Sequence, residues 1–204
     1  MAKITTFFLD VGGVLGTNGW DHHSRERAAK KFDLDYAEMT HRHDMSFGAY
    51  EEGKLSLNSY MDRVVFHKPR PYSRDDFRAF MLEQSQPDPA MLGLMADIKK
   101  KYGLKVVITS NEGRELVEHR IPLFGLDKLA DYFIFSCYIR MRKPDPNFYL
   151  MALDMNQLQP GEVAYFDDRE MFVEVARGMG INGVWQQSVE NTRDALADLG
   201  FTTD

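Results

Sequence analysis

Side chains able to do chemistry stand at four places along this sequence. The first is Asp10, which ends the apolar run from Ile4 to Leu9 and is followed two residues later by Gly12. An apolar strand that stops in a carboxylate and then turns on glycine places the carboxylate at the carboxyl edge of a sheet. Open α/β sheets bind their ligands at this edge. Glycine leaves the backbone bare, so a metal or a ligand can approach it closely.

The other three segments supply a hydroxyl and an amide, a cation, and two more carboxylates: Ser110 and Asn111 after the run 106–109, Lys143 before Pro144, and Asp167 and Asp168 after the run 163–166. Carboxylates gathered at one place repel one another unless a cation lies between them. Mg²⁺ suits this position, because it takes oxygen ligands and keeps several waters. Carboxylates, metal, lysine and hydroxyl together indicate phosphoryl transfer, in which a carboxylate can be the nucleophile.

These groups meet only if the runs that precede them are neighbouring strands. Five short apolar runs are predicted to be strands: 4–9, 105–109, 132–135, 163–166 and 182–185. The patterns of three intervening segments predict helices: 88–102, 146–155 and 170–179. Strands that alternate with helices favour the α/β class with a Rossmann-like, doubly wound parallel sheet.

The stretch from residue 17 to residue 86 interrupts this alternation. It contains no convincing buried strand, and four of its segments have helical patterns: 24–32, 36–43, 56–65 and 74–83. The Pro-containing segment that follows indicates a linker back to the sheet. We therefore predict a catalytic core formed by residues 1–16 and 87–204, with residues 17–86 inserted as a helical cap.

The composition limits the class of protein. The chain has 204 residues, 44% of them hydrophobic and 27% charged, and a net charge of −6. A nucleic-acid partner is not expected, because such proteins usually carry a basic face. The single cysteine, Cys137, fits a reducing compartment. We see neither a signal peptide nor an apolar run of the roughly 20 residues that a membrane span needs. We therefore expect a cytoplasmic protein, as a monomer or a homodimer.

The four motifs, in this order, resemble those of the haloacid dehalogenase superfamily, in the branch with a small helical cap inserted after the first strand. The matching residues are Asp10 in Phe-Leu-Asp, Ser110 in Thr-Ser-Asn, Lys143 in Arg-Lys-Pro, and the pair Asp167 and Asp168. Residues 47–56 also resemble caps of sugar-phosphate phosphatases in this family. The resemblance implies a magnesium-dependent phosphatase that acts on a small phosphorylated metabolite through an aspartyl-phosphate.

The resemblance also implies roles for the residues of these motifs. Asp10 would be the nucleophile. The ligands of Mg²⁺ would be Asp10, the backbone carbonyl of Gly12, Asp167 and, directly or through water, Asp168. The transferring phosphate would be held by Ser110, by the backbone after it at Asn111, and by Lys143.

The chain departs from the family pattern at two positions. Most phosphatases of this family carry a second aspartate two positions after the nucleophile, where this chain has Gly12. That aspartate protonates the leaving oxygen, and general acid catalysis contributes roughly 10²–10⁴-fold to a rate. In addition, Phe172 occupies a place where related sequences often have a polar amide.

Three interpretations of the missing acid remain open. In the first, the enzyme is a phosphatase whose substrate has a good leaving group, or whose cap supplies the proton. The candidate proton donors in the cap are His22, His23, His41 and His43. In the second, the enzyme is a metal-independent 2-haloacid dehalogenase, because halide leaves without a proton. In the third, the chain is a weak or silent member of the family that binds a phosphorylated ligand or a protein partner.

Overall fold

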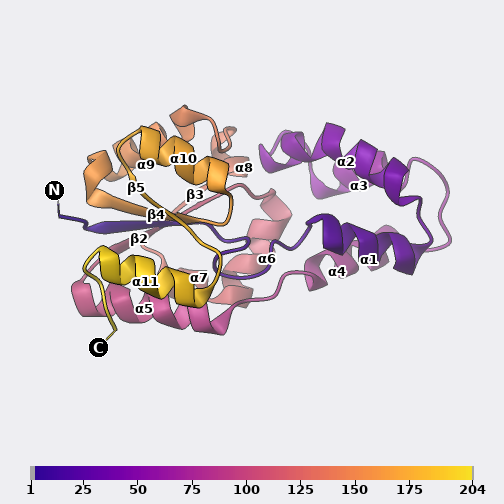
Figure 1. Cartoon of the computed structure of the whole chain (residues 1–204). Coiled ribbons are helices and arrows are strands. Elements are labelled where there is room, and N and C mark those ends of the chain that lie inside the picture. Colours follow the sequence, from indigo (N-terminus) through magenta and orange to yellow (C-terminus); the bar gives the residue numbers. More distant parts are fainter. Residues whose placement is uncertain (1–2, 204) are drawn as a thin grey trace.

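The computed structural model describes residues 3–203. Within this range, a five-stranded parallel sheet has the order β3-β2-β1-β4-β5 (Figure 1). Its strands are β1 (Thr6–Leu9), β2 (Lys105–Ser110), β3 (Tyr132–Phe135), β4 (Val163–Asp167) and β5 (Asn182–Trp185). Strand β1 lies at the centre, and all of its residues are buried. A central strand covered on both faces has this apolar composition because neither face meets water.

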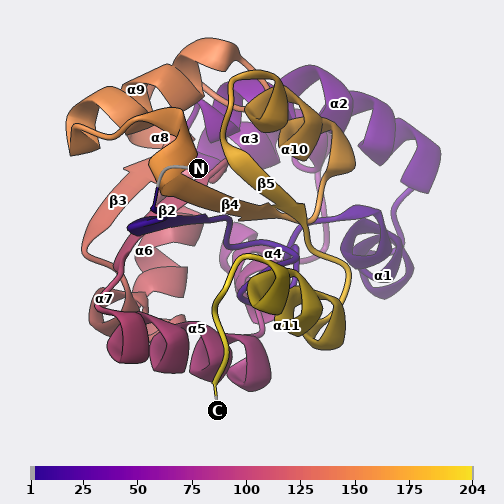
Figure 2. The ribbon, with the colours of Figure 1, turned by 60° about the vertical axis from the view of Figure 1, so that its left-hand side comes forward.

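Helices cover both faces of the sheet, so the core is a three-layer α/β structure (Figures 1 and 2). On one face lie α5 (Pro89–Tyr102), α6 (Arg114–Phe124), α7 (Leu126–Leu129) and α11 (Val189–Asp198). On the other face lie α9 (Pro146–Asn156) and α10 (Glu170–Gly178). A short helix α8 (Ser136–Ile139) follows β3, and a 3₁₀ turn η1 (Pro160–Glu162) precedes β4.

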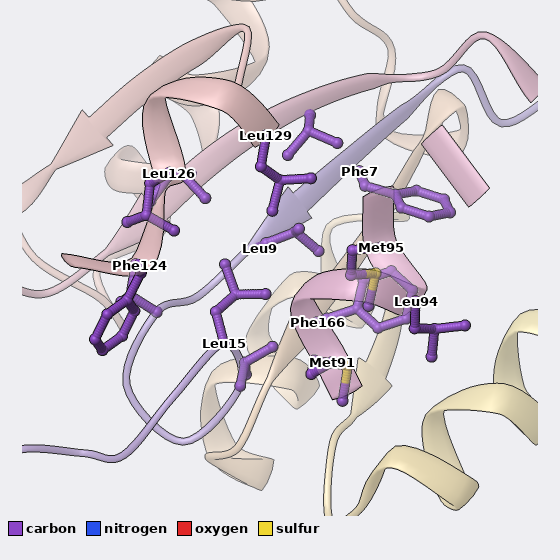
Figure 3. Close-up of a cluster of buried hydrophobic side chains, with 14 of the residues drawn as sticks. Phe7, Leu9, Leu15, Met91, Leu94, Met95, Phe124, Leu126, Leu129 and Phe166 are labelled. Carbon is purple, nitrogen blue, oxygen red and sulfur yellow. The ribbon is translucent and has the colours of Figure 1, made fainter. Parts of the chain in front are cut away.

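The strands contribute side chains to two separate hydrophobic clusters, because successive side chains of a strand point to opposite faces of the sheet. Phe7 and Leu9 of β1 pack against Met91, Met95 and other residues on the α5 side (Figure 3). Phe8, between them, belongs to the cluster on the α9 and α10 side. Each fully buried side chain of this size stabilises the fold by about 1.5–3 kcal/mol relative to exposure. Packing in these clusters fixes the positions of the strand ends that carry the polar residues.

Four helices follow β1 in sequence and precede α5: α1 (His22–Phe32), α2 (Tyr36–Glu51), α3 (Leu57–Val64) and α4 (Arg74–Glu83). Each begins at a residue whose side chain accepts a hydrogen bond from a backbone N–H of the first turn. Together the four helices bury a third hydrophobic cluster, which is nearly confined to them. These observations accord with the predicted helical cap, and we keep its limits, residues 17–86, as a proposal.

The predicted α/β sheet is confirmed, and each strand lies within two residues of its predicted bounds. The predicted bounds of the helix 36–43 were wrong, because α2 continues to Glu51. Met39, His43, Ser46 and Tyr50 are buried at spacings of three and four, so one continuous face packs inward. The predictions also missed α7 and α8, each a single turn, and α11, which is capped by Ser188.

A search of residues 3–203 finds no helix that has both the length and the apolar character to cross a membrane.

His43 gives the cap a pH-dependent stability. The residue is 7% exposed, and Nδ1 lies 2.8 Å from the hydroxyl oxygen of Tyr60. Burial, together with the positive charge of Arg25, lowers the pKa of His43 to about 3. In the unfolded chain the imidazole has a pKa of about 6.5. Between these values the unfolded state binds a proton that the folded state does not, so acidification favours unfolding.

We therefore expect the free energy of unfolding to fall between pH 6.5 and pH 3, with this histidine contributing up to about 1.4 kcal/mol per pH unit. Urea unfolding at pH 7 and pH 5 measures the effect. His43→Gln should flatten the dependence, whereas His41→Gln, at an exposed position of the same helix, should leave it unchanged. Equal pH dependence in the native protein and His43→Gln would contradict this account.

Candidate active site

The ends of three neighbouring strands bring the predicted polar residues to one edge of the sheet. Asp10 follows β1, Ser110 ends β2 and Asp167 ends β4, and β1 lies between the other two strands. All pairings are parallel, so the three carboxyl ends point the same way. The site therefore lies where parallel α/β sheets bind ligands.

Three carboxylates form a cluster at this edge. Asp10, Asp167 and Asp168 each offer an oxygen, and these oxygens all lie within 4.8 Å of one another. Gly13 permits this approach, because its φ of +77° is a conformation that favours glycine, and a Cβ there would stand 2.3 Å from Oδ2 of Asp168. The loop after β1 therefore folds directly against the carboxylate pair at the end of β4.

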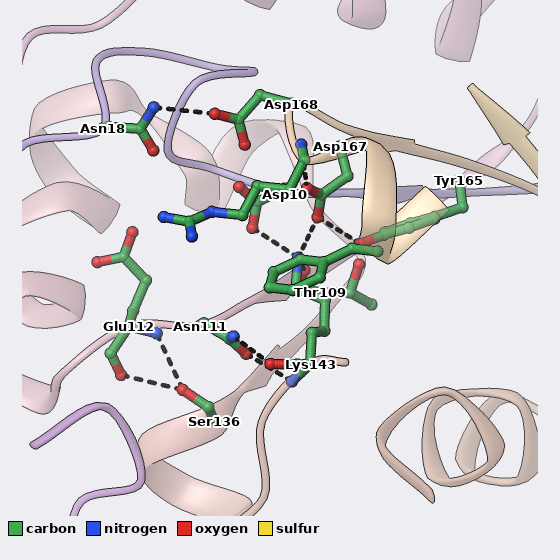
Figure 4. A network of polar contacts seen from close by, with 12 residues as sticks. Asp10, Asn18, Thr109, Asn111, Glu112, Ser136, Lys143, Tyr165, Asp167 and Asp168 are labelled. Carbon is green, nitrogen blue, oxygen red and sulfur yellow. Dashed lines mark hydrogen bonds and ion pairs between the residues drawn. The ribbon is translucent and has the colours of Figure 1, made fainter. Parts of the chain in front are cut away.

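Lys143 lies at the centre of the carboxylates, although it is distant in sequence from all of them. Its Nζ donates hydrogen bonds to Oδ1 of Asp10 at 2.8 Å, Oδ2 of Asp167 at 2.5 Å and the carbonyl of Thr109 at 2.9 Å (Figure 4). Its side chain is 1% exposed. The hydroxyl of Tyr165 also donates to Oδ2 of Asp167. This network holds an ammonium group between two buried carboxylates.

The charges of the site depend on one another. Burial raises the pKa of Asp10; Lys143 opposes this rise, while Asp167 and Asp168 add to it. Burial also raises the pKa of Asp168, which a hydrogen bond from Asn18 opposes. One lysine thus faces three carboxylates, and a further cation at this point would favour their charged forms.

Asn111 holds the loop that carries Lys143. Its Nδ2 donates to the carbonyl of Lys143 at 2.9 Å, and its Oδ1 accepts from the backbone N–H of Lys143 at 2.9 Å. The amide is thereby engaged with protein on both sides, which gives it a positioning task. Ser110 is 1% exposed, and both residues line the same pocket as Asp10. Contact of either residue with substrate stays a prediction.

A small pocket opens beside Asp10, between the cap helices and the sheet edge. Its cavity volume is about 70 Å³, and a water-sized sphere needs roughly 10–15 Å³ on this measure. The core lines it with Ser110, Lys143 and other residues, and the cap lines it with five residues: Asn18, Trp20, Asp21, Phe47 and Glu51. The pocket therefore has room for more than one water-sized group beside Asp10.

The position of the missing acid is filled from the segment that enters the cap. A Cβ on Gly12 would stand 3.1 Å from Oδ1 of Asn18, and Nδ2 of Asn18 donates to Oδ2 of Asp168 at 2.9 Å. Phe172 lines the pocket, and its ring centroid lies 5.5 Å from Nζ of Lys143. An aromatic face thus covers the lysine at the place where relatives often have an amide.

Predictions from sequence missed several residues of the pocket: Asn18, Glu51, Glu112, Arg142 and Arg169. Arg142 and Arg169 adjoin the recognised motifs, so their sequence position was the available signal. Glu51 lies in the segment 47–56 whose sequence resembles family caps, although that resemblance assigned it no role. Asn18 and Glu112 reach the pocket through the way in which the cap packs on the core.

The histidines proposed as proton donors do not lie where that task requires. His22, His23, His41 and His43 are absent from the residues that line the pocket within the range 3–203. His22 and His23 are exposed near the start of α1, and His43 is buried within the cap. Helical packing therefore places none of these candidate proton donors in the pocket lining of the described residues.

A buried arginine of the core joins the two segments that connect cap and sheet. Nη2 of Arg120 donates to the carbonyl of Thr17 at 3.1 Å, and Nε donates to Oγ of Ser85 at 3.0 Å. Nη1 forms an ion pair with Glu112, beside the pocket. Arg120 therefore fixes both linkers of the cap relative to the active-site loop.

The carboxylate cluster suits a hard divalent cation. Oxygen is the ligand that Mg²⁺ takes in proteins, and this site offers three carboxylates within a common radius. Their burial with one lysine leaves an excess of negative charge that a divalent ion would neutralise. Asp10, Asp167 and Asp168 thus fit the group that the sequence motifs imply.

Known proteins with similar sequences include phosphatases. The sequence profile of the haloacid dehalogenase-like hydrolases matches residues 4–180. The chain is 28% identical over 187 residues to the phosphorylated carbohydrates phosphatase of Thermotoga maritima, covering 87% of this chain and 82% of that protein. It is also 35% identical to bifunctional epoxide hydrolase 2 of Sus scrofa over 96% of this chain, but spans only 38% of that longer protein.

Solved structures share the fold. An HAD family enzyme from Bacteroides thetaiotaomicron, in complex with magnesium and inorganic phosphate, has a TM-score of 0.78 at 20% identity, with 90% of this chain and 94% of that chain covered. The L-2-haloacid dehalogenase of Xanthobacter autotrophicus, with chloropropionic acid covalently bound, has a TM-score of 0.64 at 16% identity, with 96% and 83% covered. The ordered motifs, the parallel sheet and the profile match lead to one conclusion: this chain belongs to the haloacid dehalogenase-like hydrolases.

Proposed function

We propose that this protein is a magnesium-dependent phosphatase that cleaves a small phosphorylated metabolite through an aspartyl-phosphate on Asp10. The observation that carries the proposal is the meeting of Asp10, Asp167, Asp168 and Lys143 at one sheet edge. A dehalogenase needs no metal, so the acidic pair after β4 would have no purpose in that reaction. The cluster therefore favours phosphoryl transfer over dehalogenation.

Each residue of the site has a distinct role in the proposed reaction. An oxygen of Asp10 attacks phosphorus in line with the leaving oxygen, while Lys143 favours the ionised form of that carboxylate and orients it through a hydrogen bond of 2.8 Å. Ser110 and the backbone at Asn111 bind the oxygens of the phosphoryl group at the carboxyl end of β2. Water then attacks phosphorus and frees Asp10. The cap excludes other water from the closed pocket.

Asp10, Asp167 and the carbonyl of Gly12 would hold Mg²⁺, with Asp168 as a direct or water-mediated ligand. When bound, Mg²⁺ supplies positive charge that offsets the negative charge of the transferring phosphoryl group. Lys143 alone would face three carboxylates and a phosphate, so we expect activity to depend on the metal.

The substrate class is a phosphorylated small molecule, with sugar phosphates as the first candidates. The phosphatase of Thermotoga maritima is named for phosphorylated carbohydrates, and it matches over most of both chains. The acidic side chains that the cap contributes to the pocket, Asp21 and Glu51, suit a hydroxylated leaving group.

A screen of phosphate esters with Mg²⁺ and with EDTA tests this function. The panel should contain sugar 1-phosphates, sugar 6-phosphates, acyl phosphates and aryl phosphates, with released phosphate as the readout. We expect phosphate release with Mg²⁺ and its loss, by at least about 100-fold, after EDTA treatment. Added Mg²⁺ should restore the activity.

Other outcomes of the same screen would overturn the proposal. Release of halide from 2-haloacids in the presence of EDTA would identify a dehalogenase. No turnover of any ester, with a cooperatively folded protein, would favour the third interpretation, a family member that binds a ligand without turnover.

A further inference from the structure

The pocket wall contains a buried carboxyl group, that of Glu51, which has no part in the metal site or in the ion pair that holds the linkers of the cap. Gly12 leaves the leaving oxygen without the aspartate that most family phosphatases place there. We propose that Glu51, the last residue of α2, is the general acid and base of this enzyme. This inference rests on the proposed phosphatase function and adds the proton donor that the reaction lacks.

Contacts across the cap and core interface fix the end of α2 at the pocket. The carbonyl of Glu51 accepts a hydrogen bond from the hydroxyl of Ser136 at 2.7 Å, and the same oxygen of Ser136 accepts from the backbone N–H of Glu112 at 2.9 Å. Figure 4 shows Ser136 and Glu112 side by side next to the site. The serine thus ties the cap residue to the loop that follows β2.

Tyr50, the residue before Glu51, also attaches the end of α2 to the core, through packing against Gly113. Tyr50 is fully buried, and a Cβ on Gly113 would stand 2.0 Å from its ring, so only glycine permits this approach. Gly113 begins the α6 helix of the core, directly after the pocket residue Glu112. These contacts of the end of α2 hold Glu51 in the pocket wall.

The cations near Glu51 compensate only part of the free-energy cost of burying its charged form. It is 8% exposed, and Oε2 lies 2.8 Å from Nη2 of Arg142 as an ion pair but takes part in no hydrogen bond within the described part of the chain. Arg169 and Lys143 also face it with positive charge, and Glu112 faces it with negative charge. Burial outweighs these cations and raises the pKa of Glu51 to about 7. A carboxyl group of this kind exchanges protons well at neutral pH.

The placement also fits the direction of the reaction. In phosphoryl transfer the attacking and leaving oxygens lie roughly in line on opposite sides of phosphorus. Asp10 is at the sheet edge, so the leaving oxygen points away from the sheet and toward the cap. Glu51 belongs to the cap side of the same pocket. It therefore lies on the side from which the proton must come.

Besides Glu51 and the nucleophile Asp10, the pocket wall contains two other acidic side chains, Asp21 and Glu112, and both make contacts that tie them to the protein. Asp21 caps α1, with its carboxylate accepting from the backbone N–H of Ser24 at 2.8 Å, and hydrogen bonding at this cap outweighs burial and lowers its pKa. Glu112 forms a buried ion pair with Arg120, which also holds the linkers of the cap. Glu51 differs from both, because its Oε2 has an ion pair with Arg142 but no hydrogen bond among the described residues.

The proton balance is complete. As the Asp10–phosphorus bond forms and the bond to the leaving oxygen breaks, the Glu51 carboxyl gives its proton to that oxygen. The resulting carboxylate then takes a proton from the water that attacks phosphorus. The Asp10–phosphorus bond breaks, phosphate leaves, and Glu51 is again protonated.

Leaving-group dependence in Glu51→Gln tests the assignment. The two probes are phenyl phosphate and p-nitrophenyl phosphate, which are similar in shape, but p-nitrophenolate leaves without a proton far more readily. We expect kcat/KM, which reports the steps up to loss of the leaving group, to fall by roughly 10²–10³-fold for phenyl phosphate and at least about tenfold less for p-nitrophenyl phosphate. The alkaline limb of the native pH–rate profile should also disappear in this variant.

Glu52→Gln is the matched control, since Glu52 is the next residue and makes an ion pair with Lys54 away from the pocket lining. It should leave both rates unchanged. Equal losses on the two probes in Glu51→Gln, with an unaltered pH profile, would overturn the acid–base assignment while leaving the phosphatase in place. A native protein that turns over neither probe, nor any ester of the panel, would instead overturn the proposed function.

Discussion

Replacing Asp10 by asparagine is expected to lower phosphate release by at least about 10⁴-fold, because removal of a nucleophile costs several orders of magnitude in kcat. Asparagine fills nearly the same volume, and Lys143 keeps its contacts with Asp167 and the carbonyl of Thr109. The variant should therefore fold. Phosphate release from the best ester of the panel, in saturating Mg²⁺, measures the effect.

Asp44→Asn is a suitable control, since Asp44 is exposed on α2 and remote from the pocket lining. It should retain native activity. If Asp10→Asn kept more than about a tenth of the native kcat, Asp10 would not be the nucleophile, and phosphoryl transfer would have to proceed through direct attack by water.

Lys143→Met is expected to affect stability as well as rate. Without the ammonium group, Asp10 and Asp167 would be buried with no counter-charge, and loss of one partner of a buried ion pair costs about 3–5 kcal/mol. The rate should fall by roughly 10²–10³-fold, since a charge that stabilises the transferring group is removed. Urea unfolding in EDTA, with kcat in Mg²⁺, measures both effects.

A control variant and the addition of Mg²⁺ test whether the loss of stability in Lys143→Met comes from the carboxylate cluster. Lys100→Met, at an exposed position of α5, should change the free energy of unfolding by less than about 0.5 kcal/mol. In Lys143→Met, added Mg²⁺ should recover part of the lost stability, because a cation again lies among the carboxylates. A variant as stable as the native protein in EDTA would show that Lys143 does not neutralise this cluster.

The sequence predicts the sheet well for a physical reason. Strands buried on both faces are short apolar runs, and glycine, proline or charged residues mark their ends, so local composition nearly fixes their bounds. Helix lengths are harder to predict. The continuation of α2 to Glu51 depends on Ser46 and Tyr50 packing inward against α3 and the core, which is a tertiary property. The single-turn helix α8 has too few residues for any periodicity.

Some residues of the candidate site could also be predicted from the sequence, and others could not. Asp10, Asp167 and Lys143 belong to strand ends or to a motif with a fixed order, and the structure brings their charged groups into direct contact. Glu51 and Asn18 come from the cap and its linker, where specificity arises from how one unit closes on the other. Sequence patterns cannot place such residues, because their neighbours are chosen by packing rather than by spacing.

Chemical trapping of the intermediate tests the central claim most directly. The protein would be quenched during turnover of a phosphate ester with Mg²⁺, reduced with borohydride and digested for peptide mass spectrometry. An aspartyl-phosphate is reduced to homoserine, so the account predicts homoserine in place of Asp10 only when ester and Mg²⁺ are both present. Phosphate release accompanied by unmodified Asp10, or by homoserine at another aspartate, would contradict it.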